Sequence, residues 1–442
     1  MNIILVIAAP FFLWALLYKP EYIAVLLFSM IIGDVNLDVP GMPLNLRAIV
    51  SICLLGRILM KKQEGDQPPF IMANFTFIVI IFFLYSMITT WANGLLDFGL
   101  FKVFITTFIS AYIGYYFFNE KGNTSLMEMG LIFGGLICVA DLAYTYMFVC
   151  SFPVNRLMDV YSGKMNRADF EPTNHNFFAY VCAMCFVFFF SEFMHGRIKN
   201  KLKILVLPTM FLGTVMSTGR TGLIVLIVVS LYVMFDIFRS SKEGSRRVFK
   251  FVSVIVLVAF AGILLFSTFS ALFNLKSTLA ENITARFVDE PIAVINKHLG
   301  FNYNVNALNS MEWREEANDV AFSAFAGLTT TEQVFGIGTM GFYARDFGHG
   351  YNAHNGILLL LIEGGIVAFV IYYTLIVLLF WKVRKVKLKS SAFVVLNFIL
   401  IFTSSNNNEM TSAMAFMIIG TLMAELEYKS RHQDEIPETT QS

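Results

Sequence analysis

Long apolar stretches separated by short polar segments dominate this chain from its first residues to about residue 427. Many of these stretches reach the roughly 20 apolar residues that a helix needs to cross a bilayer. Because the hydrocarbon core holds no water, a crossing segment must satisfy its own backbone hydrogen bonds, as a helix does. The pattern predicts thirteen spans, at residues 3–18, 22–34, 44–60, 70–91, 98–118, 125–150, 175–194, 202–217, 219–238, 250–272, 353–381, 391–407 and 410–427. The number falls to twelve if residues 3–34 form one irregular element, because Lys19-Pro20-Glu21 interrupts that region.

Composition agrees with this pattern. Hydrophobic residues make up 57% of the 442 residues and charged residues only 14%, and the mean hydropathy is +0.67. These values lie outside the range of soluble domains, so we expect an all-α polytopic integral membrane protein. The five cysteines lie in or beside apolar runs and are interpreted as packing residues. The net charge of +1 gives no indication of a nucleic-acid partner, and no tract of lysine and arginine suggests one.

Lysine and arginine recur in alternate short loops, and the positive-inside rule places those loops in the cytoplasm. The long segment at about 273–352 then lies outside. It is too rich in aromatic and aliphatic residues for a disordered loop, so we expect short helices there. The predicted organisation is an N-terminal membrane domain (1–272), this long periplasmic loop (273–352), C-terminal spans (353–427) and a cytoplasmic tail (428–442).

The segment Ser217–Gly222, with the sequence STGRTG, joins two apolar runs on the predicted outer side. Glycine lets a backbone approach a ligand closely, and serine and threonine cap helices. Free N–H groups at a helix start attract anions, and the guanidinium of Arg220 can hold phosphate oxygens in a fork. Thr218 and Thr221 flank this arginine and are candidate contacts of the same ligand. The alternative is a capped tight turn whose arginine extends to lipid headgroups.

A polar, glycine-bearing run meets a long apolar run at His354 and Asn355. The positive end of a helix dipole keeps an imidazole neutral near neutral pH, and a neutral imidazole can take a proton from a hydroxyl. His354 is therefore a candidate general base. The alternative is that His354 and Asn355 only cap the helix. His349 lies nearby, but no convincing third ligand is spaced for a metal, so no metal site is predicted.

Other polar residues gather on the same predicted outer face. Arg314, beside Trp313 in the long loop, is either a second phosphate contact or a partner of the neighbouring glutamates. Asn174 and His175 open another span and either line the same cavity or cap that helix. ATP and nucleotide sugars are not expected outside the cell, and the chain has no P-loop. A substrate for this face would arrive through the membrane, already activated.

Four pieces of the chain together resemble the O-antigen ligase and O-antigen polymerase superfamily, which attaches or polymerises bacterial surface glycans. They are Asn174–Phe178, Ser217–Gly222, Trp313 with Phe335-Gly336-Ile337-Gly338, and His354-Asn355 with Glu363-Gly364-Gly365. These pieces occur in order around one long loop, and the resemblance covers about residues 170–380.

The resemblance implies a membrane glycosyltransferase that needs no metal or cofactor and inverts the anomeric carbon. Its donor would be an undecaprenyl-diphosphate-linked glycan at the periplasmic face of the inner membrane. Arg220 would hold the diphosphate, and His354 would take the proton of the acceptor hydroxyl. The family often carries a second arginine shortly before the loop tryptophan, where this chain reads Asn309-Ser310-Met311-Glu312. Arg314 or Arg286 would then take that role.

The resemblance leaves the acceptor open. A ligase transfers to a lipid A–core saccharide or a similar acceptor, whereas a polymerase transfers to a second lipid-linked glycan. The well-formed His-Asn helix start favours the ligase type. The implied partners are these two glycans, membrane lipids and a chain-length regulator.

A transporter or flippase is the competing class. It would carry ionisable residues at the membrane midplane and paired broken helices. Only Asp141 and Glu363 lie deep within predicted spans. Glu363 faces roughly away from His354, so we expect it to be tied to a neighbouring helix, with Gly364-Gly365 allowing a close approach.

Overall fold

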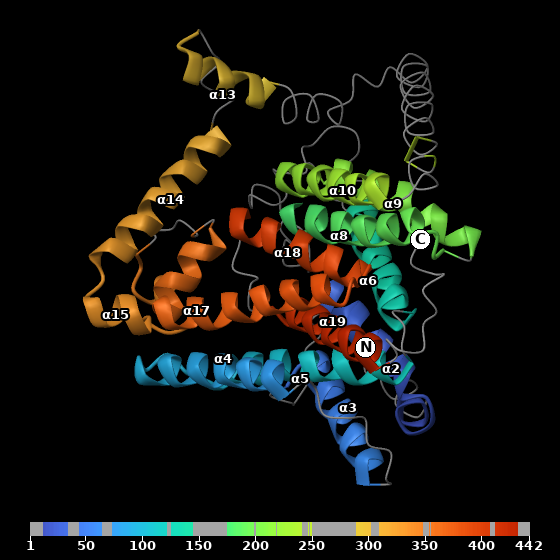
Figure 1. Ribbon diagram of the computed structural model, residues 1–442. Helices are drawn as coiled ribbons and strands as arrows, with labels where there is room; N and C mark the ends of the chain where they lie inside the picture. The colour runs from blue at the N-terminus through green and yellow to red at the C-terminus, as the bar shows by residue number, and fades with distance from the viewer. Residues whose placement is uncertain are drawn as a thin grey trace. The chain divides into compact units, whose positions relative to one another are not determined.

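The computed structural model describes residues 12–33, 44–63, 73–121, 125–144, 175–198, 200–217, 219–240, 246, 248–249, 289–301, 309–347, 353, 355–406 and 412–431. Within these residues the regular elements are helices and no β-strand occurs, which confirms the predicted all-α class (Figure 1). Six of the described helices are long and apolar enough to cross a membrane. They are α4 (Ala73–Ala92), α5 (Phe98–Lys121), α6 (Ser125–Tyr144), α8 (His175–Met194), α10 (Arg220–Ser240) and α17 (Gly356–Lys385).

Shorter or more polar helices account for the remaining predicted spans that the structure describes. They are α2 (Pro20–Ile32), α3 (Leu46–Gln63), η2 (Lys201–Leu205) with α9 (Val206–Met216), α18 (Ser391–Asn406) and α19 (Ala413–Arg431). Helix 12–18 meets α2 at an angle of 119°, so the interruption at Lys19-Pro20-Glu21 is a sharp bend. Pro20 occupies the first turn of α2, where its missing N–H costs nothing. The predicted span at 250–272 lies outside the described residues, so the total of twelve or thirteen stays a prediction.

Contacts divide the chain into two compact units. The first contains residues 1–134 and 314–437, and the second contains residues 135–313 and 438–442. These bounds differ from the predicted division at residues 272, 352 and 427, which stays a prediction. α19 continues to Arg431, so the predicted tail begins within a helix.

In the first unit, α5 and α19 approach each other closely at two glycines. A methyl group added at Gly114 would overlap the backbone of Met417, and one added at Gly420 would overlap the backbone of Ala111. Small residues allow such backbone approach between membrane helices. An aromatic cluster then joins α4, α17 and α19. Its rings are Phe82, Phe83, Tyr372 and Phe416, with Phe82 and Tyr372 centroids 5.5 Å apart.

In the second unit, α8 is the central helix. Its apolar window Asn176–Met194 is 89% buried, and its neighbours are α9 and α10. A helix that is apolar on all sides is expected to lie inside a bundle. This burial places the N-terminal end of α8 against the turn that begins α10.

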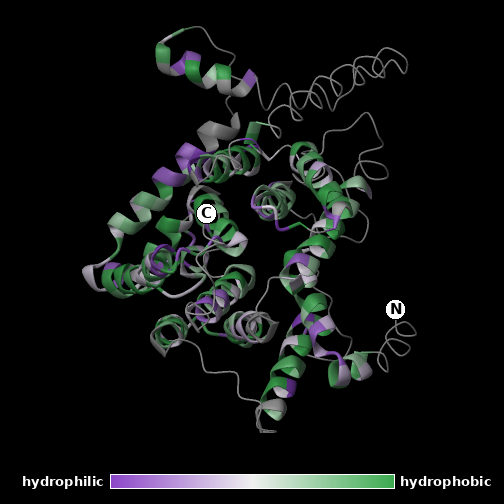
Figure 2. Cartoon of the chain, turned by 45° about the vertical axis from the view of Figure 1, so that its right-hand side comes forward, coloured by the Kyte–Doolittle hydropathy of each residue, from purple (hydrophilic) through white to green (hydrophobic). Residues whose placement is uncertain are grey.

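The long loop contains helices, as predicted, in the part that the structure describes. They are α13 (Glu290–Leu299), α14 (Asn309–Gly327), α15 (Thr330–Phe335) and α16 (Gly341–Ala344). Figure 2 shows hydrophilic residues on the loop helices among helices that are otherwise mainly hydrophobic. The loop is thus folded over much of its length.

Candidate functional site

The STGRTG segment joins α9 to α10: Ser217 follows the end of α9, and Arg220-Thr221-Gly222 form the first residues of α10. The hydroxyl of Ser217 donates to the carbonyl of Thr214 over 2.6 Å and accepts from the N–H of Gly219 at 3.3 Å. Helix α10 then begins at Arg220. The hydroxyl of Ser217 closes α9, and the absence of a side chain at Gly219 lets the turn approach Ala179 closely.

This turn lies directly on α8. A methyl group at Gly222 would lie 2.7 Å from the Cβ, 2.9 Å from the carbonyl carbon and 3.0 Å from the carbonyl oxygen of Ala179. A methyl group at Gly219 would overlap the Cβ of Ala179, and Asn176 Oδ1 lies 3.5 Å from its position. The structure therefore brings two sequence-predicted pieces, 174–178 and 217–222, together at one end of the second unit.

Arg220 is buried, with 8% of its surface exposed, and it is the first residue of α10. A buried guanidinium at a helix start adds its charge to the positive end of the helix dipole. This burial argues against the alternative in which the side chain extends to lipid headgroups. Asn176 is buried to the same degree. The arrangement is suited to binding an anion.

In the first unit, Asn355 is the N-cap of α17. Its Oδ1 accepts from the N–H groups of Ile357 at 3.1 Å and Leu358 at 3.2 Å. The helix begins at Gly356, two residues after the predicted start at His354, and Asn355 performs the capping role that was one of its two interpretations. Contact between Asn355 and substrate stays a prediction. Such a contact would use the Nδ2 donor, because Oδ1 accepts the capping hydrogen bonds.

Helix α17 is interrupted at Gly365, which the sequence analysis did not predict. Gly365 has φ 67° and ψ −178°, a conformation open to glycine. The carbonyls freed by the break accept from loop N–H groups: Ile337 donates to Ile362 over 3.1 Å, and Gly338 donates to Glu363 over 2.9 Å. The apolar residues after the break, 366–381, extend about 24 Å at 1.5 Å per residue, and the basic residues Lys382, Arg384 and Lys385 follow them.

These first turns of α17 share a small hydrophobic core with the loop helices. Its buried members are Ala321, Leu328, Ile337, Phe342, Ala353, Leu359 and Ile362. We call residues 314–347 together with 353–365 the cap. Within this cap, Glu363 is held by the loop, because its carboxylate lies against the backbone amides of Met340 and Phe342. The sequence analysis expected Glu363 to be tied to a neighbouring helix, and the structure shows that this neighbour is the start of the short loop helix α16.

Hydrogen bonds fix the cap to the end of α4. Tyr85 donates from its hydroxyl to the carbonyl of Phe335 over 2.8 Å, and the N–H of Thr339 donates to the hydroxyl of Thr90 over 3.0 Å. A methyl group at Gly338 would lie 2.9 Å from the Cα of Thr90. The segment after α15 thus lies between α4 and the break in α17.

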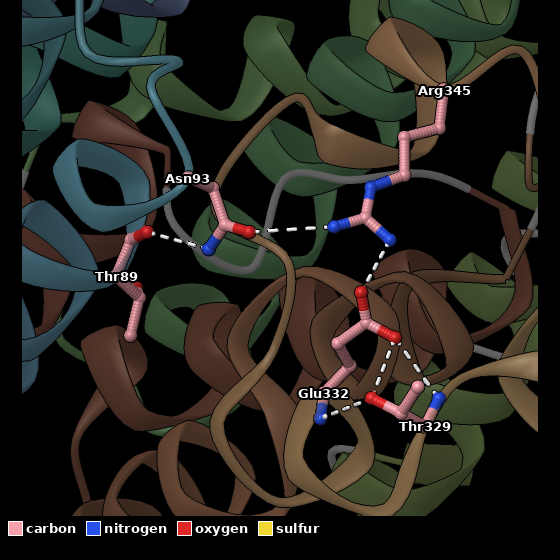
Figure 3. Close-up of polar contacts among 5 residues, drawn as sticks. All are labelled: Thr89, Asn93, Thr329, Glu332 and Arg345. Carbon is pink, nitrogen blue, oxygen red and sulfur yellow. Dashed lines mark hydrogen bonds and ion pairs between the residues drawn. The ribbon is translucent and has the colours of Figure 1, made fainter.

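Arg345 extends this connection (Figure 3). Its guanidinium lies 2.6 Å from Glu332 and 3.4 Å from Oδ1 of Asn93. Glu332 also accepts from the N–H and hydroxyl of Thr329, which is the N-cap of α15. The Arg345 guanidinium and these bonds from Thr329 lower the pKa of Glu332 to about 2. The sequence analysis did not single out Arg345 or Glu332, although the pattern T-x-x-E at Thr329–Glu332 is a recognisable capping-box signal.

The structure describes only some of the sequence-predicted site residues. Arg220 and Thr221 lie in the first turn of α10, Asn355 caps α17, and Arg314 is half-buried in α14. His175 is the first residue of α8. The remaining predicted site residues, His354, Thr218, Asn174 and Arg286, lie outside the described residues. Their roles stay predictions.

Two further observations concern metals and thiols. In the described part of the chain, no group of three or more His, Cys, Asp or Glu side chains is arranged to hold a metal ion. Four cysteines are described there as free thiols, and three of them, Cys138, Cys182 and Cys185, are buried among helices. The independence of the reaction from metal stays a prediction.

Comparison with known proteins gives one family. Residues 205–373 match the sequence model of a family described as O-antigen ligase. The match covers less than half of the chain and includes the α9–α10 turn, the described loop helices and the first half of α17. No curated protein matches the chain. The family match confirms the resemblance to the O-antigen ligase and polymerase superfamily, with three of its four pieces inside the matched residues and Asn174–Phe178 before them.

Proposed function

We propose that this multi-pass membrane protein, which carries an O-antigen ligase-type segment at residues 205–373, transfers a glycan from undecaprenyl diphosphate to a saccharide hydroxyl. The reaction would take place at the periplasmic face of the bacterial inner membrane, with a lipid A–core saccharide or similar acceptor. The observation that carries the proposal is the buried Arg220 at the start of α10, packed beside the start of α8.

Arg220 would bind the diphosphate of the donor. As the bond between the anomeric carbon and the phosphate oxygen breaks, negative charge grows on the leaving diphosphate. A guanidinium that is already held at a helix N-terminus stabilises this charge without reorganising. Thr218, Thr221 and the start of α8 (Asn174 and His175) would contribute further contacts to the same group.

His354 would act as the general base. It would take the proton of the acceptor hydroxyl while the oxygen forms a bond to the anomeric carbon from the side opposite the diphosphate. The configuration at that carbon is thereby inverted. Asn355 is the N-cap of α17. This cap fixes the start of the helix next to His354, so Asn355 would help to position the base.

A second arginine from the loop would complete the diphosphate site. Arg314 is half-buried in α14, so it is the described candidate, and Arg286 is the other. No metal or cofactor takes part in this scheme. Beyond the two glycans and membrane lipids, a chain-length regulator is the expected partner.

The break in α17 does not favour the transporter alternative. Broken helices in transporters leave backbone groups to coordinate a substrate near the midplane. Here the freed carbonyls of Ile362 and Glu363 are occupied by N–H groups of Ile337 and Gly338. The carbonyls at this break are therefore hydrogen-bonded within the protein, as in a structural junction.

A complementation experiment tests the proposal. A strain that lacks the protein receives the wild type, Arg220→Ala, Arg220→Lys or His354→Ala, and surface glycans and undecaprenyl-linked glycans are analysed. Arg239→Ala is the matched control, because Arg239 lies exposed at the other end of the same helix. Immunoblots of membranes confirm equal amounts of each variant.

We expect long polymer to accumulate on undecaprenyl in the deletion strain and to return to the acceptor with the wild type and with Arg239→Ala. Arg220→Ala and His354→Ala should fail to restore it, and Arg220→Lys should restore it weakly because the fork geometry is lost. A single repeat on the acceptor, with no long polymer on undecaprenyl, would instead identify a polymerase. A normal glycan pattern in the deletion strain would refute glycan transfer altogether.

A further inference from the structure

The second part of α17 presents one exposed side along its length. After the break at Gly365, exposed residues recur at intervals of three or four, which is the spacing of one helix face. They are Ile366, Val370, Thr374, Val377 and Trp381. On the opposite side, Tyr372, Leu379 and Val383 are buried. The exposed residues therefore point away from the first unit, as lipid-facing residues of a spanning helix do, and we call them the outer stripe.

The outer stripe has the dimensions of one leaflet. From Val370 to Trp381 it extends about 17 Å at 1.5 Å per residue, which is close to half of a hydrocarbon core of roughly 30 Å. Val370, Val377 and Trp381 are each more than half exposed. Tryptophan is enriched at the membrane–water interface. The end of α17 beyond Trp381 is thus expected at the level of the lipid headgroups.

Two lysine ammonium groups lie over the ring of Trp381. Lys382 lies 5.6 Å and Lys385 lies 5.3 Å from the ring centroid. A cation at this distance from an indole face is attracted by the ring. Lys385 also continues the outer stripe one turn beyond Trp381. The ring therefore holds both ammonium groups beside the lipid-facing side of the helix.

The turn after α17 adds further cations. Lys387 has φ 50°, the left-handed conformation that ends many helices and usually belongs to glycine. Its N–H donates to the carbonyl of Arg384 over 3.2 Å, and its own carbonyl accepts from the ammonium of Lys429 over 3.2 Å. Burial and the neighbouring Lys389 lower the pKa of Lys429, as expected where positive charges lie close together.

The positive charge at this end of α17 exceeds the negative charge that compensates it. In the part of the chain that the structure describes, four of its cations form no ion pair, and we call these four the basic cluster: Lys382, Arg384, Lys385 and Lys387. The carboxylate of Glu425 accepts from the hydroxyl of Ser390. That of Glu427 accepts from the hydroxyl of Tyr115. The negative end of the helix dipole amounts to only about half a charge, so a positive surplus remains.

We infer that this surface binds an anionic phospholipid, with its phosphate at Lys382 and Lys385 and its acyl chains along the outer stripe. The positive-inside rule places this end of α17 in the cytoplasmic leaflet. A zwitterionic headgroup carries its own cation, which the basic cluster would repel, so phosphatidylglycerol is favoured over phosphatidylethanolamine. The inference does not depend on glycan transfer, so its failure would leave the proposed function as it stands.

Native mass spectrometry of the full-length protein in detergent tests the inference. Separate arms titrate it with phosphatidylglycerol and with phosphatidylethanolamine of the same acyl chains. One double variant, Lys382→Gln with Lys385→Gln, removes both charges and keeps good helix formers. A second, Lys382→Arg with Lys385→Arg, keeps the charges. Arg239→Gln is the matched control, because Arg239 also lies in the last turn of a spanning helix, 5.6 Å from the centroid of an aromatic ring, but has Asp236 one turn before it.

We expect the wild type to bind phosphatidylglycerol more tightly than phosphatidylethanolamine. Each lysine beside an anionic headgroup contributes a factor of roughly five, so the double glutamine variant should bind phosphatidylglycerol about 25-fold more weakly. The double arginine variant and Arg239→Gln should keep the preference. Equal binding of the two lipids by the wild type, or an unchanged preference in the glutamine variant, would overturn the inference. Displacement of the bound lipid by soluble polyphosphate would also overturn it and assign the basic cluster to a soluble polyanion.

Discussion

The backbone N–H of Gly338 donates to the carbonyl of Glu363 over 2.9 Å, at the point where α17 breaks. A loop segment therefore supplies the hydrogen bond that the helix loses. A methyl group at Gly365 would overlap the backbone of Val334 and Gly336, and one at Gly336 would overlap the backbone of Glu363. This junction joins the cap to the membrane part of α17.

Alanine at this junction should destabilise the protein. Gly365→Ala and Gly336→Ala each add backbone overlap to a positive φ, so we expect a loss of about 2 kcal/mol or more. Thermal unfolding in detergent measures it. Gly327→Ala is the control, because nothing lies within 4 Å of its added methyl, and it should unfold with the wild type. Equal unfolding of Gly365→Ala and Gly327→Ala would contradict the observed junction.

The two glycines of the α9–α10 turn should respond differently to a second substitution. For Gly219→Ala the clash is with the Cβ of Ala179, and the other near atoms are 3.5 Å away. Adding Ala179→Gly should therefore restore stability and glycan transfer. For Gly222→Ala the backbone of Ala179 stays 2.9–3.0 Å away, so the same addition should not restore it.

Thermal stability and transfer of the four variants and the wild type, measured together, check this difference. Each uncompensated clash is expected to cost about 1–3 kcal/mol. Rescue of both glycine variants, or of neither, would show that the turn does not pack on Ala179 as described.

The Glu332–Arg345 pair should make stability depend on acidity. The folded state lowers the pKa of Glu332 to about 2, so its stabilising contribution is complete above the unfolded pKa near 4.3. The contribution is lost as pH falls through that window toward 2. Wild type should unfold at a higher temperature than Glu332→Gln near neutral pH, and the gap should close on acidification. Because the pair is partly exposed, we expect less than about 1 kcal/mol. A gap that stays constant with pH would argue against the pair.

Asn355 should show two separable roles. Asn355→Ala removes the N-cap and should lower stability by about 1 kcal/mol, whereas Asn355→Ser keeps a capping oxygen. If the amide Nδ2 also contacts substrate, the serine variant should be stable but transfer roughly tenfold less glycan. Thermal unfolding and transfer assays measure the two effects. Full activity in the serine variant would restrict Asn355 to capping.

Long apolar runs in the sequence predicted the positions of the described spanning helices, because a spanning segment depends on its own composition. The start of α17 at Asn355 and the start of α10 at Arg220 follow from local capping and turn signals. The break at Gly365 was not predicted, because it depends on a loop segment about 28 residues earlier in sequence, near Ile337. Gly336 and Gly338 were visible as a motif, but nothing local showed what they approach.

In the candidate site too, local sequence predicted the helix starts but not the contacts between separate elements. Sequence alone indicated that residues 174–178 and 217–222 are polar helix starts, and the structure brings them together at Ala179. Arg345 was not recognised as a structural residue, because its partners Glu332 and Asn93 come from two separate elements. Pairing across elements cannot be derived from spacing along one segment.

The most direct test of the account is transfer by the purified full-length protein in liposomes. Undecaprenyl-linked glycan and acceptor glycolipid are supplied with EDTA, and mass spectrometry follows the joined product. The account predicts product with the wild type and Arg239→Ala, a rate about 10² to 10⁴ lower with His354→Ala, and one about 10² to 10³ lower with Arg220→Ala. Wild-type rates in either His354→Ala or Arg220→Ala would contradict the central claim that these two residues carry the transfer.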